Sequence, residues 1–414
     1  MRLPAEGLAL LKQRNVVLFL LARLFANIGA QMQTVAVGWQ VYEKTGSALD
    51  LGWIGLSQFA PFVLLILPAG HLADHHDRRR ILILCYCMQA LCALALGVYT
   101  WSGSNHVWPI FVVMTLLGVV RAFSMPAGQS LLPNLVAKEQ FSRAVAMNAT
   151  MFQSSTILGP TFGGLLVLIG VQSVYVATLI CGVICTATIA NIKLPPRVAS
   201  ETPAAHRDAG SHSLLSGLNF VRSQPLVLGA ISLDLFAVLF GGATALLPIY
   251  ARDILHVGPT GLGMLRSAVG LGALVSALWL SATPITRHVG RWLFGSVLTF
   301  GVSTIVFGVS THFLLSLIAL AILGASDMIS VFVRGYLVQL VTPDAIRGRV
   351  SAVSSVFIGA SNELGEFESG TTAHWWGTVA AVIVGGSVTV AVSLLWTRLF
   401  PTLRSMDKFP DRSN

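Results

Sequence analysis

Twelve long apolar segments, separated by short polar connections, constrain this chain more than any other feature. A helix that crosses a membrane needs about 20 mainly apolar residues, and each segment has about that length. The Leu, Val and Ala runs lack the two-residue alternation of membrane-barrel strands. We therefore predict an all-α membrane protein with twelve transmembrane helices, at roughly 16–42, 51–73, 81–100, 108–134, 143–169, 172–192, 226–250, 260–282, 292–310, 313–340, 350–371 and 373–398.

Composition excludes several other classes of protein. Only 10% of the 414 residues are charged, against roughly 25% in soluble domains. Lys and Arg form short clusters between apolar segments, so the net charge of +9 does not indicate a nucleic-acid partner. The first apolar segment runs on from Val16 to Tyr42 without a cleavage site, so we expect a retained helix and no signal peptide.

The distribution of basic residues predicts the orientation in the membrane. If the N-terminus is cytoplasmic, twenty Lys and Arg residues fall on the cytoplasmic side, and only Lys44 and Arg252 fall outside. The positive-inside rule then places both termini in the cytoplasm, in a bacterial-type inner membrane. Four arginines remain inside the helices, and these are Arg23, Arg121, Arg266 and Arg334.

The connection at 194–213 carries Pro195, Pro196, Pro203 and Gly210, and we expect a cytoplasmic linker there. The apolar residues that follow predict a short interfacial helix before Pro225. The expected organisation is an N-terminal half at 1–193, the linker with its short helix at 194–224, a C-terminal half at 225–400 and a tail at 401–414.

An internal repeat supports two six-helix halves. A shift of 206 positions carries Arg143 onto Arg349, and it also aligns Gly159 with Gly365 and Gly164 with Gly370. Paired halves with a site between them are a known transporter architecture.

The connection after the second segment reads Gly70-His-Leu-Ala-Asp74-His-His-Asp-Arg78-Arg79-Arg80. It resembles the signature of the major facilitator superfamily at this place, with His75 and Asp77 departing from the pattern. The resemblance implies a cytoplasmic gate in which Asp74 faces the start of the eleventh helix, near Arg349. A solvated turn that only obeys the positive-inside rule is the alternative. The gate residues would be Gly70, Asp74, Arg78, Arg79, Arg80 and Arg349.

The fifth segment carries Gly159-Pro160-Thr161-Phe162-Gly163-Gly164, which resembles the end of the superfamily's antiporter motif. Ala146 and Ser155 replace upstream glycines of that motif. Tight helix packing explains the glycines as well as an antiport role does. The segments RAFSMPAGQSLLPNLV, SGLNFVRSQPL and TPDAIRGRVS resemble the branch that contains the enterobactin and macrolide exporters.

Acids inside apolar segments are costly and mark pathways or ion pairs. Glu363 and Glu366 share a helical face, and Glu368 turns away from Glu366. Two neighbouring carboxylates in a medium of low dielectric do not both ionise easily, so we expect one of them to hold a proton. These three are the candidate proton-coupling residues, with a wet vestibule or pairing to arginines as the alternative.

Other polar residues on the helices that line the cavity in this superfamily predict a substrate site. Asp327 and Arg334 lie seven residues apart, so they could bracket a polar or anionic substrate, and structural ion pairs are the alternative. The cavity candidates are Arg23, Asn27, Gln31, Arg121, Asp234, Asp327 and Arg334.

No metal site or cofactor is expected. The five cysteines lie inside apolar segments without zinc-ligand spacing, and the histidines of the basic turn lack a matching cage. A nucleotide-binding Gly-x-x-x-x-Gly-Lys pattern is missing from the sequence, so an ion or substrate gradient must drive transport.

The sequence therefore predicts a monomeric, lipid-embedded secondary transporter that exports a small organic compound, a siderophore or an amphiphilic drug, in exchange for protons. A carrier for another solute, such as a lysolipid, a metal ion or a metabolite, is the first alternative. A membrane-embedded enzyme or sensor is more remote, because no His-Glu-x-x-His or Gly-x-Ser-x-Gly pattern occurs.

Overall fold

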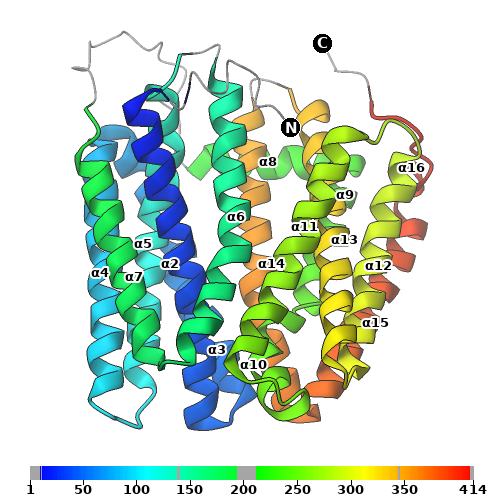
Figure 1. The fold of residues 1–414 in the computed structure, drawn as a ribbon. Helices are drawn as coiled ribbons and strands as arrows, with labels where there is room; N and C mark the ends of the chain where they lie inside the picture. The colour runs from blue at the N-terminus through cyan, green and yellow to red at the C-terminus, as the bar shows by residue number, and fades with distance from the viewer. Residues whose placement is uncertain (1–9, 11, 138–139, 194–210, 344–345, 411–414) are drawn as a thin grey trace. The chain divides into compact units, whose positions relative to one another are not determined.

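A computed structural model gives the fold, and it describes residues 10, 12–137, 140–193, 211–343 and 346–410 (Figure 1). Within these ranges all regular structure is helical. The predicted linker at 194–210 lies outside the described residues. Contacts divide the chain into two compact units, which we call unit 1 (Met1–Ala199 with Tyr250–Ser267) and unit 2 (Ser200–Ile249 with Ala268–Asn414). The four-part division expected from the sequence stays a prediction.

Six long helices form most of unit 1. Extensive contacts pair α3 with α5, α4 with α7, and α2 with both α6 and α7. Their apolar faces meet in two clusters of buried residues, one around Phe19 and Tyr86 and the other around Val37 and Tyr175. The helices are α2 (Arg14–Thr45), α3 (Ala48–His75), α4 (Arg78–Trp101), α5 (Trp108–Leu131, extended by the 3-10 turn η1, Leu132–Asn134), α6 (Phe141–Val167) and α7 (Val171–Ala190).

Unit 2 is built around α9, α12, α13, α14 and α15. The helix predicted before Pro225 is present as α8, which packs on α14 and α9. A core cluster around Leu233, Leu293 and Leu337 fills the space between α9, α12 and α13. The bounds are α8 (Ser211–Ser223), α9 (Pro225–Phe240), α11 (Gly258–Ala282, shared with unit 1), α12 (Val289–Val309), α13 (Phe313–Val341), α14 (Arg347–Trp376), α15 (Thr378–Leu399) and α16 (Pro401–Arg404).

The seventh predicted helix is not continuous, and this part of the prediction was wrong. The α-helix stops at Phe240 and is followed by η3 (Ala243–Leu246), α10 (Leu247–Ile249) and the π-helical turn η4 (Tyr250–Ile254). A Cβ on Gly241 would lie 2.5 Å from Phe300 Cε1, and one on Gly242 would lie 2.7 Å from the carbonyl oxygen of Gly365. The two glycines therefore let the chain leave the helix at a place where α12 and α14 approach it closely.

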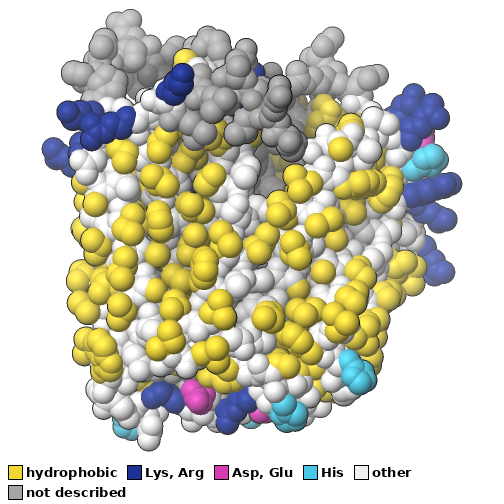
Figure 2. Space-filling model, in the orientation of Figure 1, with side chains coloured by type: hydrophobic (Ala, Val, Ile, Leu, Met, Phe, Trp, Pro, Cys, Tyr) yellow, Lys and Arg dark blue, Asp and Glu magenta, His cyan; other side chains and the backbone are white. Residues whose placement is uncertain are grey.

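Ten described helices are long and apolar enough to cross a membrane. The two long helices not among them are α6 and α14, which carry more polar residues. With these two, the twelve predicted spans are accounted for. Hydrophobic side chains cover the flanks of the helices on the face drawn in Figure 2, whereas Lys and Arg gather towards the helix ends. This distribution suits helices that lie in lipid.

Candidate transport site

A buried ion pair joins two helices of unit 2. Arg334 on α13 donates from Nη1 to Oδ2 of Asp234 on α9, and the two residues are only 3% and 4% exposed. Such a pair is retained in low dielectric because each charge compensates the other. The structure therefore contains an interhelical ion pair between Asp234 and Arg334, and the role of these residues in a substrate cavity stays a prediction.

A small pocket lies beside the ion pair. Asp327 and Asp234 both line it, and the other lining residues come from α9, α12 and α13. The polar part of the lining consists of three serine side chains, those of Ser296, Ser326 and Ser330. Asp327 itself makes no ion pair among the described residues. The pocket and the ion pair together hold two carboxylates and one guanidinium, so a single proton would make this group of three neutral.

The glutamates of α14 form a separate group, since α14 contributes none of the residues that line this pocket. Glu363 is buried, with 9% exposure, and Glu366 and Glu368 are half-buried. The hydroxyl of Ser369 lies 3.5 Å from Oε2 of Glu368. The structure thus holds three carboxylates within one membrane helix, as the sequence predicted.

The polar residues predicted for a cavity in unit 1 occupy different surroundings. Gln31 on α2 packs its Cβ against Gly159 of α6. Arg23 lies next to Gly128 of α5, and Arg121 stacks over the ring of Phe62 with its Cζ 4.9 Å from the ring centroid. Asn27 lies on α2 and is half-buried. Cation–π contact lowers the cost of holding Arg121 among apolar side chains.

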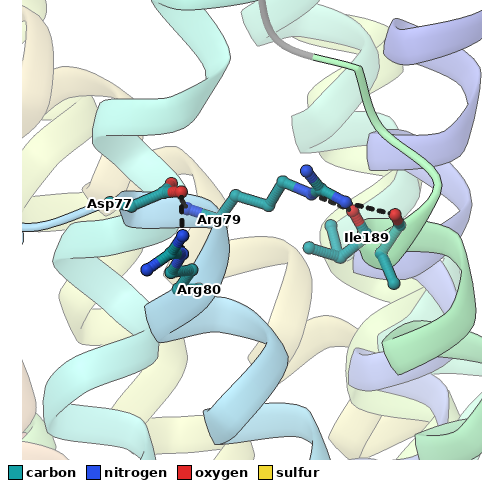
Figure 3. Close-up of polar contacts among 5 residues, drawn as sticks. Asp77, Arg79, Arg80 and Ile189 are labelled. Carbon is teal, nitrogen blue, oxygen red and sulfur yellow. Dashed lines mark hydrogen bonds and ion pairs between the residues drawn. The ribbon is translucent and has the colours of Figure 1, made fainter.

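The arginines of the predicted gate bind helix ends within unit 1. Arg78 Nη1 donates to the carbonyl oxygen of Ser130 at the end of α5, at 3.1 Å. Arg79 Nε donates to that of Ile189 at the end of α7, also at 3.1 Å (Figure 3). Arg80 pairs with Asp77 at 3.6 Å. Cations suit these places because helix C-termini carry partial negative charge.

The remaining gate residues are less informative. Asp74 lies in α3, but its side chain is outside what the structure describes. A Cβ on Gly70 would meet nothing within 4 Å among the described residues. The backbone of Arg349, on α14, lies against Gly217 of α8.

The glycines of the fifth-helix motif are places of close packing. A Cβ on Gly163 would lie 3.1 Å from Met32 Cα on α2, and one on Gly164 would lie 2.9 Å from Gly263 Cα on α11. Gly159 also faces α2, and Pro160 stands inside α6. These glycines allow α6 to pack closely against α2 and α11, and an antiport role of the motif stays a prediction.

Two polar contacts in unit 1 were missed by sequence reasoning. The Tyr175 hydroxyl donates to Gln40 Oε1 at 2.6 Å in the buried core. Tyr42 at the end of α2 donates to Asp253 of η4, and Arg252 Nη1 donates back to the carbonyl oxygen of Tyr42 at 3.1 Å. Buried polar groups need partners, so the position of Gln40 within the apolar run from Val35 to Val41 was the available signal for the first contact. Nothing in the sequence joined Tyr42 to η4.

Comparison with known proteins decides the family. The model of the transmembrane secretion effector family, a branch of the major facilitator superfamily, matches residues 5–413. The chain belongs to this family. It is 26% identical to the multidrug efflux pump Tap of Mycolicibacterium fortuitum, over 96% of this chain and 98% of that protein. It is also 26% identical to the enterobactin exporter EntS of Citrobacter koseri, over 94% and 92% of the two chains.

Solved structures agree on the fold. A bacterial homologue of the human lysosomal transporter Spinster, in an inward-facing conformation, aligns with a TM-score of 0.75 at 14% identity, covering 95% of this chain and 99% of that one. The D-xylose-proton symporter aligns with a TM-score of 0.72 at 13% identity, covering 96% and 99%. The twelve-helix major facilitator fold predicted from the sequence is confirmed, and the chain is a transporter of the efflux type, not an enzyme.

Proposed function

We propose that this transporter exports a siderophore or an amphiphilic drug in exchange for protons, by alternating access of its two halves. The names of the relatives support a cargo of this kind, because they include a multidrug pump, an enterobactin exporter and a macrolide efflux protein. We further propose that it acts as a monomer in a bacterial inner membrane with both termini in the cytoplasm, as the twenty basic residues on one side suggest.

One observation that supports proton coupling, whichever acid carries the proton, is the placement of Asp327. Its carboxylate lines a pocket beside the Asp234–Arg334 pair, and the guanidinium of Arg334 is already engaged by Asp234. Losing or gaining a proton at this place changes the net charge of the group between −1 and zero. A change of charge inside a membrane is expensive, so the two protonation states would favour different conformations.

Glu363, with Glu366 as its neighbour, is our first candidate for the residue that carries the coupling proton. Its support is the burial of its side chain within α14, the helix that also carries Arg349 of the proposed gate. Glu368 is a third acid of the same helix. Asp327 and Asp234 are the next candidates, and they lie on α13 and α9. Arg23, Asn27, Gln31, Arg121 and Arg334 would shape the substrate cavity together with them.

Transport into proteoliposomes tests this function. A pH difference should drive accumulation of a fluorescent drug such as a macrolide analogue or of a catecholate siderophore in the unaltered protein. Glu363→Gln should abolish pH-driven accumulation while leaving downhill exchange, because a neutral amide cannot release a proton. Asp327→Asn and Glu366→Gln are measured in the same way. Glu43→Gln, an exposed acid at the end of α2, is the matched control.

The outcomes separate the candidates. Loss of pH-driven transport in one acid variant identifies the carrier. Intact pH-driven transport in all three variants, singly and together, would place the proton pathway elsewhere. Transport that ignores the pH difference in the unaltered protein would contradict antiport, and a panel of lysolipids, metal ions and metabolites would then test the alternative cargoes.

A further inference from the structure

Exposed basic side chains gather at one end of unit 2, where α12 begins and α15 ends. They come from the α11–α12 connection, the first turn of α12, the end of α15 and the tail beyond it. Figure 2 shows Lys and Arg side chains at the edge where Figure 1 places α16. We call this group the basic rim, and its members are Arg287, Arg291, Arg398, Arg404 and Lys408.

The tail is fixed to α12, and this contact brings the charges together. Val289 and Gly290 donate their backbone N–H groups to the carbonyl oxygens of Asp407 and Met406, at 3.2 and 2.9 Å. The Asp407 carboxylate accepts the N–H of His288 at 3.1 Å. Free N–H groups at the start of a helix need such acceptors. The tail thus caps α12, and it carries Arg404 and Lys408 to the first turn of that helix.

Apolar contacts hold the tail in the same place. Met406 and Phe409 pack against the core cluster that contains Leu293 and Leu403. The ring of Phe409 meets that of Tyr336 on α13 edge-on, with centroids 4.6 Å apart. The charges of the tail are therefore part of the folded surface of unit 2.

A pair of tryptophans marks the depth of the rim in the membrane. Trp279 lies near the end of α11 and Trp292 near the start of α12, with ring centroids 5.4 Å apart. Their side chains are 41% and 40% exposed, although both lie on membrane-spanning helices. Exposed tryptophans at the ends of such helices favour the level of the lipid headgroups. Arg287 and Arg291 stand next to this pair along the chain.

The basic turn of unit 1, at residues 77–80, differs from the basic rim because its arginine side chains already have partners. Arg78 and Arg79 donate to backbone carbonyls, and Arg80 pairs with Asp77 (Figure 3). Among the described residues, the five rim side chains make no hydrogen bond or ion pair. The acid of the tail within the described residues, Asp407, lies 3.7 Å from Nε2 of His288. The positive-inside rule accounts for charge at either place, but only the rim leaves it available to an external anion.

We propose that the basic rim binds the headgroup of an anionic phospholipid. Basic residues near a membrane surface attract anionic lipids, and here five are held at one edge beside two interfacial tryptophans. A soluble acidic protein fits less well, because the neighbouring rings of Trp279 and Trp292 would then be left in water. This site is independent of the proposed transport reaction.

Quenching by brominated lipids tests the site in the full-length protein. The chain is reconstituted in phosphatidylcholine with increasing fractions of brominated phosphatidylglycerol or brominated phosphatidylcholine. The quenching of Trp279 and Trp292 is obtained by subtracting the fluorescence quenching of the double variant Trp279→Phe/Trp292→Phe from that of the unaltered protein. At low salt we expect brominated phosphatidylglycerol to quench this pair about fivefold more strongly than brominated phosphatidylcholine does. The ratio should be smaller in high salt, because salt screens exposed charges.

Two triple variants locate the effect. Arg287→Gln/Arg291→Gln/Lys408→Gln should bring the ratio for the two lipids close to one. The control Lys12→Gln/Arg14→Gln/Lys193→Gln, which removes three exposed charges from unit 1, should keep the preference. Equal quenching by the two lipids in the unaltered protein would overturn the proposal and favour a soluble acidic partner. A preference that survives in the rim variant would overturn it too, and melting temperatures check that both variants are folded.

Discussion

Removing the guanidinium of Arg334 should destabilise the protein more than removing either acid near it. Arg334→Gln leaves Asp234 and Asp327 at one pocket without their cation. Breaking a buried ion pair on one side costs about 3–5 kcal/mol, because the other charge is left uncompensated. We expect a loss in that range for the free energy of unfolding at neutral pH.

Asp234→Asn should lower the free energy of unfolding by less than Arg334→Gln does. Of the three charges, Arg334 and Asp327 remain in this variant, so their net charge is zero without any added proton. We expect a loss of about 1–3 kcal/mol, the cost typical of a buried polar group that loses its partner. The double variant Asp234→Asn/Arg334→Gln should recover part of the loss, since neither charge of the pair is then present.

The pH dependence has a definite sign. In Arg334→Gln no cation compensates the two carboxylates, so the folded state is favoured when they are protonated. The loss of unfolding free energy in this variant should therefore become smaller as the pH falls. Unfolding by heat and by SDS in detergent, at pH 7.5 and 5.5, measures these differences. Arg222→Gln, an exposed arginine on α8, is the control for loss of charge. The reasoning would be refuted if Arg334→Gln and Asp234→Asn lost the same unfolding free energy, if the two losses added in the double variant, and if neither loss changed with pH.

Three further predictions concern packing, orientation and the gate. Gly324→Ala places a Cβ against the backbone carbonyl of Val269 and should lower the free energy of unfolding by about 1–3 kcal/mol. Gly335→Ala, on the same helix, places a Cβ that meets nothing within 4 Å, so its stability should be unchanged or higher. Thermal unfolding compares the two variants. Cysteines introduced at Lys44 and at Arg207 in a cysteine-free chain should be labelled from opposite sides of the membrane, and labelling of both from outside would contradict the topology. Asp74→Asn should shift the conformational equilibrium inward by about 1–3 kcal/mol, and an unchanged pattern of cross-links across the cytoplasmic ends would count against the gate.

Much of the fold follows from hydropathy alone, because each spanning helix satisfies its own backbone and needs no partner to be recognised. The break in the seventh helix does not follow in this way. The apolar run continues through Gly241 and Gly242, and only the positions of Phe300 and Gly365 show why the chain leaves the helix there. The family motifs located the basic turn, but carbonyl groups at the ends of α5 and α7 decide what Arg78 and Arg79 bind.

The partner of Arg334 shows where spacing along one helix stops being informative. Asp327 lies seven residues earlier, which corresponds to about 10.5 Å along the helix axis. Side chains on one helix meet when they are three or four residues apart, at about 5–6 Å between Cβ atoms. A guanidinium at this place therefore needs an acid from another helix, and Asp234 on α9 supplies it. Asp327 makes no ion pair among the described residues, because the fold brings two acids and one arginine together at this place. Proton exchange at its carboxylate stays a prediction, and Asp327→Asn tests it.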